Sequence, residues 1–224
     1  MNWSATCAVV IPCCNEESTI AGLVQEVRGH LAIVIVVDDG SCDQTSARAA
    51  GAGAQVVRLD QNRGKGAALK AGMAAASAQS CAWGLMMDAD GQHRPDDIPG
   101  FLRCAEETSA SLVVGNRMSS AQAMPCLRRW VNRWMSRHIS ERARRFFPDS
   151  QCGFRLVELN AWSTLRLVTN HFEIESEMLL AFAQAGYRIE FVPIQMIPQG
   201  RRSRIRPVRD TLRWLRWWNR GNGA

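Results

Sequence analysis

The sequence predicts an α/β fold with a mostly parallel central sheet and helices on both of its faces. Short apolar runs recur along the first half of the chain, and most are followed by a stretch with the periodicity or the capping residues of a helix. This alternation repeats about five times before residue 117. A chain of 224 residues with 46% hydrophobic residues can bury one large core. We therefore expect a main domain over 1–200 and a short basic segment over 201–224.

Five apolar runs are the expected strands. Short runs of this kind are typical of parallel strands that are covered by helices on both faces. They lie at residues 7–11, 32–37, 55–59, 82–87 and 112–114. Asp38 and Asp39 directly follow the second run, and Asp88 directly follows the fourth. The strands are therefore expected to deliver acidic residues to one edge of the sheet.

The helices are expected between these runs. The apolar residues of 20–27 have helical spacing, and Asp43 and Thr45 can cap the helix that follows the second strand. The stretch 67–78 is rich in alanine, which favours a helix. Pro95 precedes two acids at the first turn of another helix. Each expected helix thus connects two expected strands, as a parallel sheet requires.

Asp88 and Asp90 follow the fourth expected strand, one residue apart. Because side chains alternate along an extended segment, both carboxylates are expected on the same side of the chain. Two hard oxygen donors at one point suit Mg²⁺ or Mn²⁺, which completes its shell with phosphate oxygens of a substrate. The alternative is a solvated acidic turn that is closed by Gly91.

The polar motifs after strands one, two, four and five are expected to form one site, because ligands of such sheets bind beyond the carboxyl ends of the strands. No G-x-G-x-x-G follows the first strand, which disfavours a dinucleotide-binding dehydrogenase. No G-x-x-x-x-G-K-[ST] occurs, which excludes a P-loop nucleotidase. Residues 62–66, Asn-Arg-Gly-Lys-Gly, either cradle a phosphate or form a tight turn, and the sequence leaves both open.

Charge is distributed unevenly along the chain. Residues 1–116 contain 8 Lys+Arg and 13 Asp+Glu, whereas 117–224 contain 19 Arg, no Lys and 8 Asp+Glu. Guanidinium groups pair with phosphate through two parallel hydrogen bonds, so the arginine-rich half indicates phosphate recognition or contact with an anionic surface. Within it, 125–147 is an amphipathic stretch that either packs a tryptophan face on the domain or touches a membrane. In 208–219 an arginine stripe opposite Trp and Leu predicts an interfacial helix, with docking on the domain as the alternative.

Three acidic residues alternate at Glu173, Glu175 and Glu177. In an extended segment all three would share one face. If a helix begins at about Glu175 instead, Glu173 alone faces the site and the other two are acids of the first turn.

Seven motifs together resemble family 2 glycosyltransferases, and most of all the branch of dolichyl-phosphate mannose synthase-like and undecaprenyl-phosphate glycosyltransferases. The motifs are Val9-Val10-Ile11-Pro12, Asn15-Glu16-Glu17, Val36-Val37-Asp38-Asp39-Gly40-Ser41, Asn62-Arg63-Gly64-Lys65-Gly66, Asp88-Ala89-Asp90-Gly91-Gln92-His93, Asp149-Ser150-Gln151-Cys152-Gly153-Phe154-Arg155 and Phe172-Glu173. The match runs in order from residue 7 to about residue 215.

The resemblance implies a GT-A fold, a UDP- or GDP-linked sugar donor, an inverting transfer, and Mg²⁺ or Mn²⁺ as cofactor. The candidates for binding the nucleotide sugar are Pro12, Cys13, Glu16, Asp39, Lys65, Asp88 and Ala89, with Asp39 reading the edge of the base. The candidates for binding the metal are Asp90 and Gln92. The candidates for binding the acceptor or the diphosphate are Arg117, Gln151, Arg202 and Arg204. The candidate catalytic residues are Asp88, Asp90, Arg117, Glu173 and Glu175. The branch usually has Ala-Tyr where this chain has Cys13 and Cys14.

The expected function is transfer of a hexose to a polyprenyl phosphate, which is largely ionised at neutral pH and needs no base. The alternative acceptor is a hydroxyl of a glycan or glycolipid. Relatives that use a hydroxyl commonly have an aspartate base where this chain has Ile174, and Glu175 is the available substitute. A third interpretation is a basic module that binds nucleic acid or acidic lipid without catalysis. It leaves the ordered acidic motifs unexplained, so no nucleic acid partner is expected.

The expected location is the cytoplasmic face of a membrane, with peripheral contact through the C-terminal tail. The longest apolar runs are far too short to cross a bilayer. The eight cysteines include no C-x-x-C pair, which is typical of reduced packing residues in the cytosol.

Overall fold

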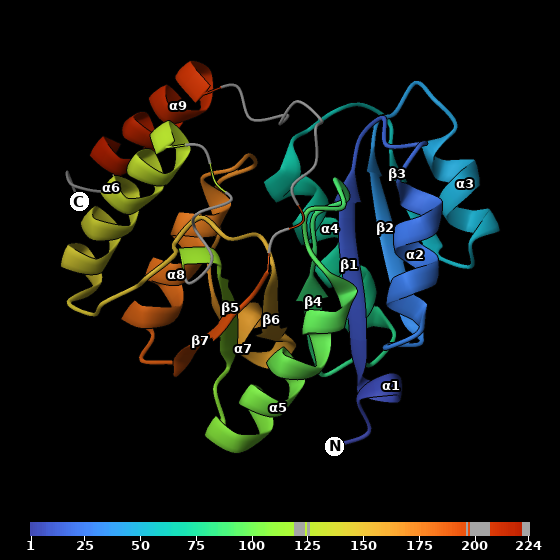
Figure 1. Cartoon of the computed structure of the whole chain (residues 1–224), viewed down its shortest axis with the longest axis horizontal. Coiled ribbons are helices and arrows are strands. Elements are labelled where there is room, and N and C mark those ends of the chain that lie inside the picture. Colours follow the sequence, from blue (N-terminus) through green and yellow to red (C-terminus); the bar gives the residue numbers. More distant parts are fainter. Residues whose placement is uncertain (119–123, 125, 196, 198–206, 221–224) are drawn as a thin grey trace.

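The computed structural model describes all residues except 119–123, 125, 196, 198–206 and 221–224. It is a central sheet with helices on both faces (Figure 1). The strands are β1 (Cys7–Cys13), β2 (Ile33–Asp39), β3 (Gln55–Leu59), β4 (Trp83–Met86), β5 (Leu112–Asn116), β6 (Arg155–Glu158) and β7 (Ile189–Pro193). The helices are α1 (Trp3–Thr6), α2 (Ile20–Arg28), α3 (Thr45–Gly51), α4 (Lys65–Ala78), the 3₁₀ helix η1 (Pro95–Asp97), α5 (Ile98–Thr108), α6 (Cys126–Ala143), α7 (Leu159–Thr164), α8 (Ile174–Gln184) and α9 (Pro207–Arg220).

The described strands form one seven-stranded sheet in the order β3-β2-β1-β4-β6-β5-β7. All neighbouring pairs are parallel except the two that involve β6, which runs antiparallel to β4 and to β5. The carboxyl ends of the six parallel strands therefore lie at one edge of the sheet, and the loop that precedes β6 reaches the same edge. This confirms the predicted mostly parallel α/β fold.

The five expected strands are confirmed, with ends that differ by at most two residues from the apolar runs. The sequence did not predict β6 and β7. β6 begins at Arg155, which looks like the end of a polar loop because a fully buried arginine is rare. β7 lies at the edge of the sheet, where the charged Glu190 is tolerated within the strand and interrupts the apolar pattern.

The core lies between the sheet and the helices, and α4 shows why one helix is so rich in alanine. All seven residues of β1 are buried. A Cβ atom added at Gly72 of α4 would collide with Val10 of β1 and approach Val37 of β2. The helix backbone therefore lies directly on the two strands, which only small residues allow. This close contact holds the start of α4 beside the carboxyl ends of β1 and β2.

Helices α6 and α9 lie side by side at one end of the molecule (Figure 1). Trp214 of α9 is only 2% exposed and packs against Trp134 of α6, with ring centroids 5.5 Å apart. For Trp214 the structure thus has the docked arrangement, which was the alternative to an interfacial helix. In contrast, Leu127 and Trp130 of α6 are 71% and 64% exposed. Among the described residues, no helix combines the length and apolar character needed to cross a membrane.

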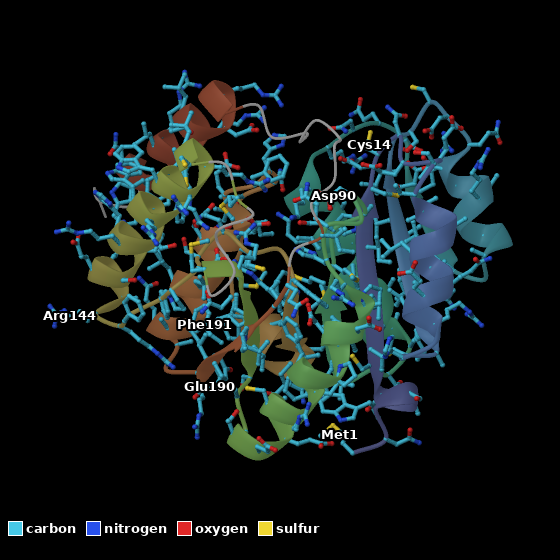
Figure 2. All side chains as sticks on the ribbon, in the orientation of Figure 1. Met1, Cys14, Asp90, Arg144, Glu190 and Phe191 are labelled. Atoms are coloured by element: carbon cyan, nitrogen blue, oxygen red, sulfur yellow. The ribbon has the colours of Figure 1, made fainter. Side chains whose placement is uncertain are left out.

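Residues from the polar motifs of the sequence lie toward one end of the strands and not toward the other. When all side chains are drawn (Figure 2), Cys14 and Asp90 lie toward one end of the strands, whereas Met1 and Glu190 lie toward the other. Cys14 and Asp90 follow β1 and β4 respectively. The motifs that were singled out in the sequence therefore meet at one edge.

Candidate active site

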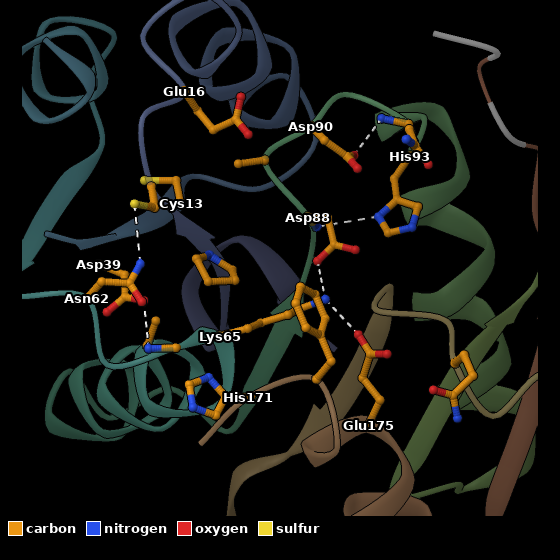
Figure 3. A pocket seen from close by; sticks show the side chains of 18 of the residues that line it. Cys13, Glu16, Asp39, Asn62, Lys65, Asp88, Asp90, His93, His171 and Glu175 are labelled. Carbon is orange, nitrogen blue, oxygen red and sulfur yellow. Dashed lines mark hydrogen bonds and ion pairs between the residues drawn. The ribbon is translucent and has the colours of Figure 1, made fainter. Parts of the chain in front are cut away.

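A cavity of about 450 Å³ opens at the carboxyl ends of the parallel strands (Figure 3). The predicted site residues that line it are Pro12, Cys13, Glu16, Asp39, Lys65, Asp88, Ala89, Asp90, Gln92, Arg117, Gln151 and Glu175. Glu173 is not among the residues that line it. Arg202 and Arg204 lie outside the described residues. Motifs that are far apart in sequence thus form the walls of one cavity.

Asp88 and Asp90 both line the cavity just beyond β4, as Figure 3 shows. Asp88 forms an ion pair with Lys65. Burial alone would raise the pKa of Asp88, but the Lys65 ammonium outweighs it and lowers the pKa to about 2. Burial, together with the nearby Asp88 carboxylate, raises the pKa of Asp90. Asp90 accepts a hydrogen bond from the backbone N–H of Gln92 at 3.0 Å, which orients its carboxylate.

Lys65 links two acidic residues across the cavity. It forms ion pairs with Asp88 and with Glu175, whose Oε1 lies 2.6 Å from the ammonium. Burial alone would lower the pKa of Lys65, but the two carboxylates raise it. A Cβ atom at Gly153 would lie 2.6 Å from an Asp88 oxygen and 2.7 Å from the Lys65 nitrogen, so a side chain at this position would displace the ion pair. The ammonium also lies 5.6 Å from the centre of the Phe172 ring.

In the tight turn that leads into α4, three backbone N–H groups already have partners within the protein. The carboxylate of Asp39 accepts hydrogen bonds from the N–H groups of Arg63 at 2.7 Å and Gly64 at 2.8 Å. The N–H group of Gly66 donates to the carbonyl of Asn170 at 2.8 Å. Of the two interpretations of residues 62–66, the structure favours the turn over a phosphate cradle.

Arg117 and Asp149 form a buried, two-pronged ion pair. Arg117 Nε lies 2.7 Å from Asp149 Oδ2, and Arg117 Nη2 lies 2.8 Å from Asp149 Oδ1. Asn132 of α6 also donates to Asp149, at 3.1 Å. Burial alone would raise the pKa of Asp149, but Arg117 outweighs it and lowers the pKa to about 2. Asp149 therefore fixes the position in which Arg117 lines the cavity.

The alternative prediction for the three alternating acids is confirmed for the helix start and for Glu175 and Glu177 as acids of its first turn, but it was wrong for Glu173 as the acid that faces the site. Helix α8 begins at Ile174, so the acids are not extended, yet it is Glu175 and not Glu173 that lines the cavity. Glu173 is buried just before the helix. Glu177 accepts hydrogen bonds from the N–H groups of Val168 and Thr169 and so holds the loop that precedes α8. The reason is geometric, because one helical turn points residues two apart in different directions.

Among the residues that were not proposed from the sequence as site residues, five contribute to the charge or the geometry of the site. Arg128 of α6 and Arg209 and Arg213 of α9 line the cavity. Arg155 is fully buried and donates hydrogen bonds to the carbonyls of Cys152, Ser150 and Glu175, which positions the acid of α8. His93 accepts a hydrogen bond from the backbone N–H of Asp88 at 3.4 Å. All five had a signal in the sequence, because His93 and Arg155 close motifs that carry the family resemblance and the other three arginines lie in the amphipathic stretches 125–147 and 208–219.

The donor set around Asp90 fits a divalent cation that relies on its substrate for ligands. Among the described residues, no three His, Cys, Asp or Glu side chains are close enough to hold a metal on their own. Mg²⁺ is usually bound through one or two carboxylates and completes its octahedral shell with water and substrate phosphates. A buried carboxylate with a raised pKa next to a second carboxylate is stabilised by a nearby cation. Asp90 and Gln92 therefore suit such an ion.

The family whose description is "Glycosyl transferase family 2" matches residues 8–155. The chain belongs to this family. The family 2 chain is 31% identical to glycosyltransferase AglJ of Haloferax volcanii, over 90% of this chain and 67% of the relative. It is 28% identical to the UDP-N-acetylglucosamine–dolichyl-phosphate N-acetylglucosaminyltransferase of Methanococcus voltae, over 84% of each protein. The name of the Methanococcus voltae relative states a dolichyl-phosphate acceptor, which is consistent with the branch that the motifs indicated.

Solved structures confirm the GT-A fold of this family 2 glycosyltransferase. Glucosyl-3-phosphoglycerate synthase of Mycobacterium tuberculosis, in complex with Mn²⁺, UDP and phosphoglyceric acid, matches with a TM-score of 0.72 and 23% identity, over 94% of this chain and 75% of the other. The same synthase has also been crystallised with Mg²⁺ and UDP. The likeness at this identity concerns the fold. The family match and the glycosyltransferase relatives identify the chain as a nucleotide-sugar glycosyltransferase.

We expect the ion pair of Asp149 to make stability depend on pH in acid. Because the pKa is about 2 in the folded protein and about 3.9 in an unfolded chain, the unfolded state takes up the proton first as the pH falls. The pair's contribution of about 2 kcal/mol is complete above about pH 4 and is lost toward pH 2. Urea unfolding of the wild type and of Asp149→Asn should show a free-energy gap that narrows over this range. A gap of constant size would contradict the prediction.

Proposed function

We propose that this glycosyltransferase transfers a hexose from a UDP- or GDP-linked donor to the phosphate of a polyprenyl lipid, with inversion at the anomeric carbon. The observation that carries the proposal is the division of the cavity into an acidic half and an arginine half. The acidic half contains Glu16, Asp39, Asp88 and Asp90, and the arginine half contains Arg117, Arg128, Arg209 and Arg213. The Methanococcus voltae relative, whose name states a dolichyl-phosphate acceptor, supports this acceptor class.

The acidic half is proposed to bind the donor. Pro12 and Cys13 at the end of β1 and Glu16 just after it form the wall for the base and ribose, and Asp39 stands at the end of β2. The two N–H groups that donate to Asp39 leave its oxygens with further lone pairs for the edge of a base. Asp90 and Gln92 would hold Mg²⁺ or Mn²⁺, which would supply positive charge beside the diphosphate.

In the proposed reaction, an oxygen of the acceptor phosphate attacks the anomeric carbon of the sugar from the face opposite the diphosphate. The new carbon–oxygen bond forms while the bond from that carbon to the diphosphate oxygen breaks, and its electron pair leaves with the nucleoside diphosphate. The guanidinium of Arg117 stabilises the charge that grows on the leaving group, because it is already in place before the reaction begins.

The position of Glu175 supports an acceptor that needs no base. A hydroxyl acceptor must lose its proton to a positioned carboxylate, and Glu175 is the acid of α8 that lines the cavity. Its Oε1 is held at 2.6 Å by Lys65, and its carbonyl is held by Arg155. A lipid phosphate is already largely ionised at neutral pH. Glu175 is therefore assigned to holding Lys65 rather than to removing a proton.

Peripheral membrane contact is proposed to involve helices α6 and α9. The part of α9 that faces outward includes Leu212, which is 48% exposed. Leu127 and Trp130 add exposed apolar side chains on α6. Tryptophan and leucine next to arginine are typical of segments that lie in the interface of an anionic membrane. Such a contact would bring a membrane-embedded lipid phosphate near the arginine half.

We expect label from a UDP- or GDP-hexose to enter an organic-extractable product when Mg²⁺ or Mn²⁺ and undecaprenyl phosphate in anionic vesicles are both present. The experiment compares a panel of donors with and without the lipid phosphate, and with EDTA in place of the metal. Label that depends on the lipid phosphate supports the proposal and names the donor. If the donor were consumed only with a hydroxyl acceptor, the acceptor would be a glycan or glycolipid hydroxyl and not a polyprenyl phosphate. Failure to bind any nucleotide in the presence of metal would overturn the proposal.

A further inference from the structure

The four arginines that line the cavity do not contribute equally to its positive charge. Arg117 is paired with Asp149 through two hydrogen bonds, so the pair has no net charge. Asp210 of α9 lies 3.6 Å from Arg209 Nε and 3.7 Å from Arg213 Nη1, and it offsets one of these two charges. Helix α9 therefore adds a net positive charge to the cavity.

The position of these α9 arginines is fixed by the way the helix docks. The indole N–H of Trp214 donates to Ser176 Oγ of α8 at 2.9 Å, and the Trp214 ring stacks on Trp218 with centroids 5.2 Å apart. Ser176 Oγ also accepts from the side-chain amide of Gln151 at 2.7 Å. Gln151 lines the cavity. The anchor of α9 is thus joined through one hydroxyl group to the cavity wall.

The same helix presents Arg209 and Arg213 to the cavity, one turn apart. Their side chains are 50% and 29% exposed, so a ligand from solvent can reach both. In Figure 1, α9 and α6 lie at the opposite side of the molecule from β2 and β3, where Asp39 forms part of the proposed nucleotide wall. The two guanidinium groups therefore enter the cavity from the side away from the base.

We propose that Arg209 and Arg213 of α9 bind the phosphate of the acceptor. This inference rests on the proposed function, which supplies a phosphate acceptor, and adds that the recognition comes from the C-terminal helix. Two guanidinium groups one turn apart suit a phosphate dianion, because each can donate two parallel hydrogen bonds to its oxygens. The donor diphosphate would be bound by Arg117 and by the metal ion at Asp90, on the opposite side of the cavity from α9.

The test uses farnesyl phosphate, a short acceptor that does not require a membrane surface, and the donor that the wild type turns over. The variants are Arg209→Ala, Arg213→Ala and the double variant. Arg216→Ala is the matched control, because Arg216 is exposed on the same helix and does not line the cavity. We expect the KM for farnesyl phosphate to rise about tenfold or more in each single variant and about 100-fold in the double variant. The KM for the donor and the calorimetric Kd for UDP with Mn²⁺ should change less than about twofold, as should all values for Arg216→Ala.

Four other results would contradict the inference, and they distinguish its failure from failure of the proposed function. An unchanged acceptor KM in the double variant, with an active wild type, overturns the inference and leaves the proposed function standing. A weaker affinity for UDP would assign the two arginines to the donor and overturn it as well. An equal loss in Arg216→Ala would show an unspecific effect of charge. Absence of transfer to any isoprenyl phosphate by the wild type would remove the proposed function, and the inference with it.

Discussion

Replacing Asp90 with asparagine is expected to lower the rate of sugar transfer by about 100-fold or more. Asp90 lines the cavity next to Asp88, and burial and that neighbour raise its pKa, so its carboxylate gains from a nearby cation. Asparagine keeps the shape and one carbonyl oxygen but removes the charge that binds Mg²⁺ or Mn²⁺. Without the cation, the negative charge that grows on the leaving diphosphate loses its largest stabilising partner.

The measurement combines transfer kinetics with calorimetric binding of UDP in the presence and absence of Mn²⁺. For the wild type, Mn²⁺ should strengthen UDP binding, whereas for Asp90→Asn it should make little difference. Asp96→Asn is the matched control, because it removes the same charge from a side chain that is 72% exposed and does not line the cavity. If Asp90→Asn kept metal-dependent UDP binding, the assignment of the metal to Asp90 would be wrong.

Replacing Lys65 with methionine is expected to lower the free energy of unfolding by about 3 kcal/mol and to reduce transfer in the protein that remains folded. Methionine preserves most of the apolar stem but leaves the carboxylates of Asp88 and Glu175 side by side without a cation. Breaking a buried ion pair by removing one partner typically costs about 3–5 kcal/mol. The lower figure applies here, because the Asp88 side chain is 30% exposed to the cavity.

A double-mutant cycle isolates this effect. Glu175→Gln in the Lys65→Met background removes one of the two unpaired charges and should restore part of the lost stability. Lys70→Met is the matched control, because Lys70 is the only other lysine of the chain, lies in the same helix and donates a single exposed hydrogen bond to Asn170. Urea unfolding measures the wild type, Lys65→Met, Glu175→Gln, the double variant and the Lys70→Met control. A loss below about 1 kcal/mol in Lys65→Met, or no rescue by Glu175→Gln, would show that the two ion pairs are not coupled through Lys65.

The half of the site that follows the parallel strands could be predicted from the sequence. The apolar runs identify the strands, and parallel strands end at one edge, so Asp39 and Asp88 had to approach each other. The same argument accounts for Pro12 near the end of β1 and for Arg117 directly after β5. These positions follow from the apolar runs that mark the strands and from the alternation of strands with helices, and both can be seen locally in the sequence.

The other half of the site is formed by helices α6 and α9, and how these helices pack could not be predicted from the sequence. Arg128, Arg209 and Arg213 reach the cavity because α9 docks on α6 and α8 through Trp214. The sequence shows that α9 is amphipathic, but it does not show whether its apolar face packs on other helices or on a membrane. The pairing of Lys65 with Glu175 joins residues that are 110 positions apart. Such a contact is decided by the path of the whole chain.

Because β6 runs antiparallel to its neighbours, the loop that precedes it lies at the same edge of the sheet as the cavity, and the opposite edge carries none of the described residues that line the cavity. The loop before β6 carries Gln151 and Gly153 to the edge where the parallel strands end, beside the other described residues of the site. Met1 lies toward the opposite end of the strands (Figure 2). A fluorophore or an affinity handle attached through the amino terminus would therefore stand clear of the cavity. The protein can be immobilised by that end with its substrate entrance directed toward the solution.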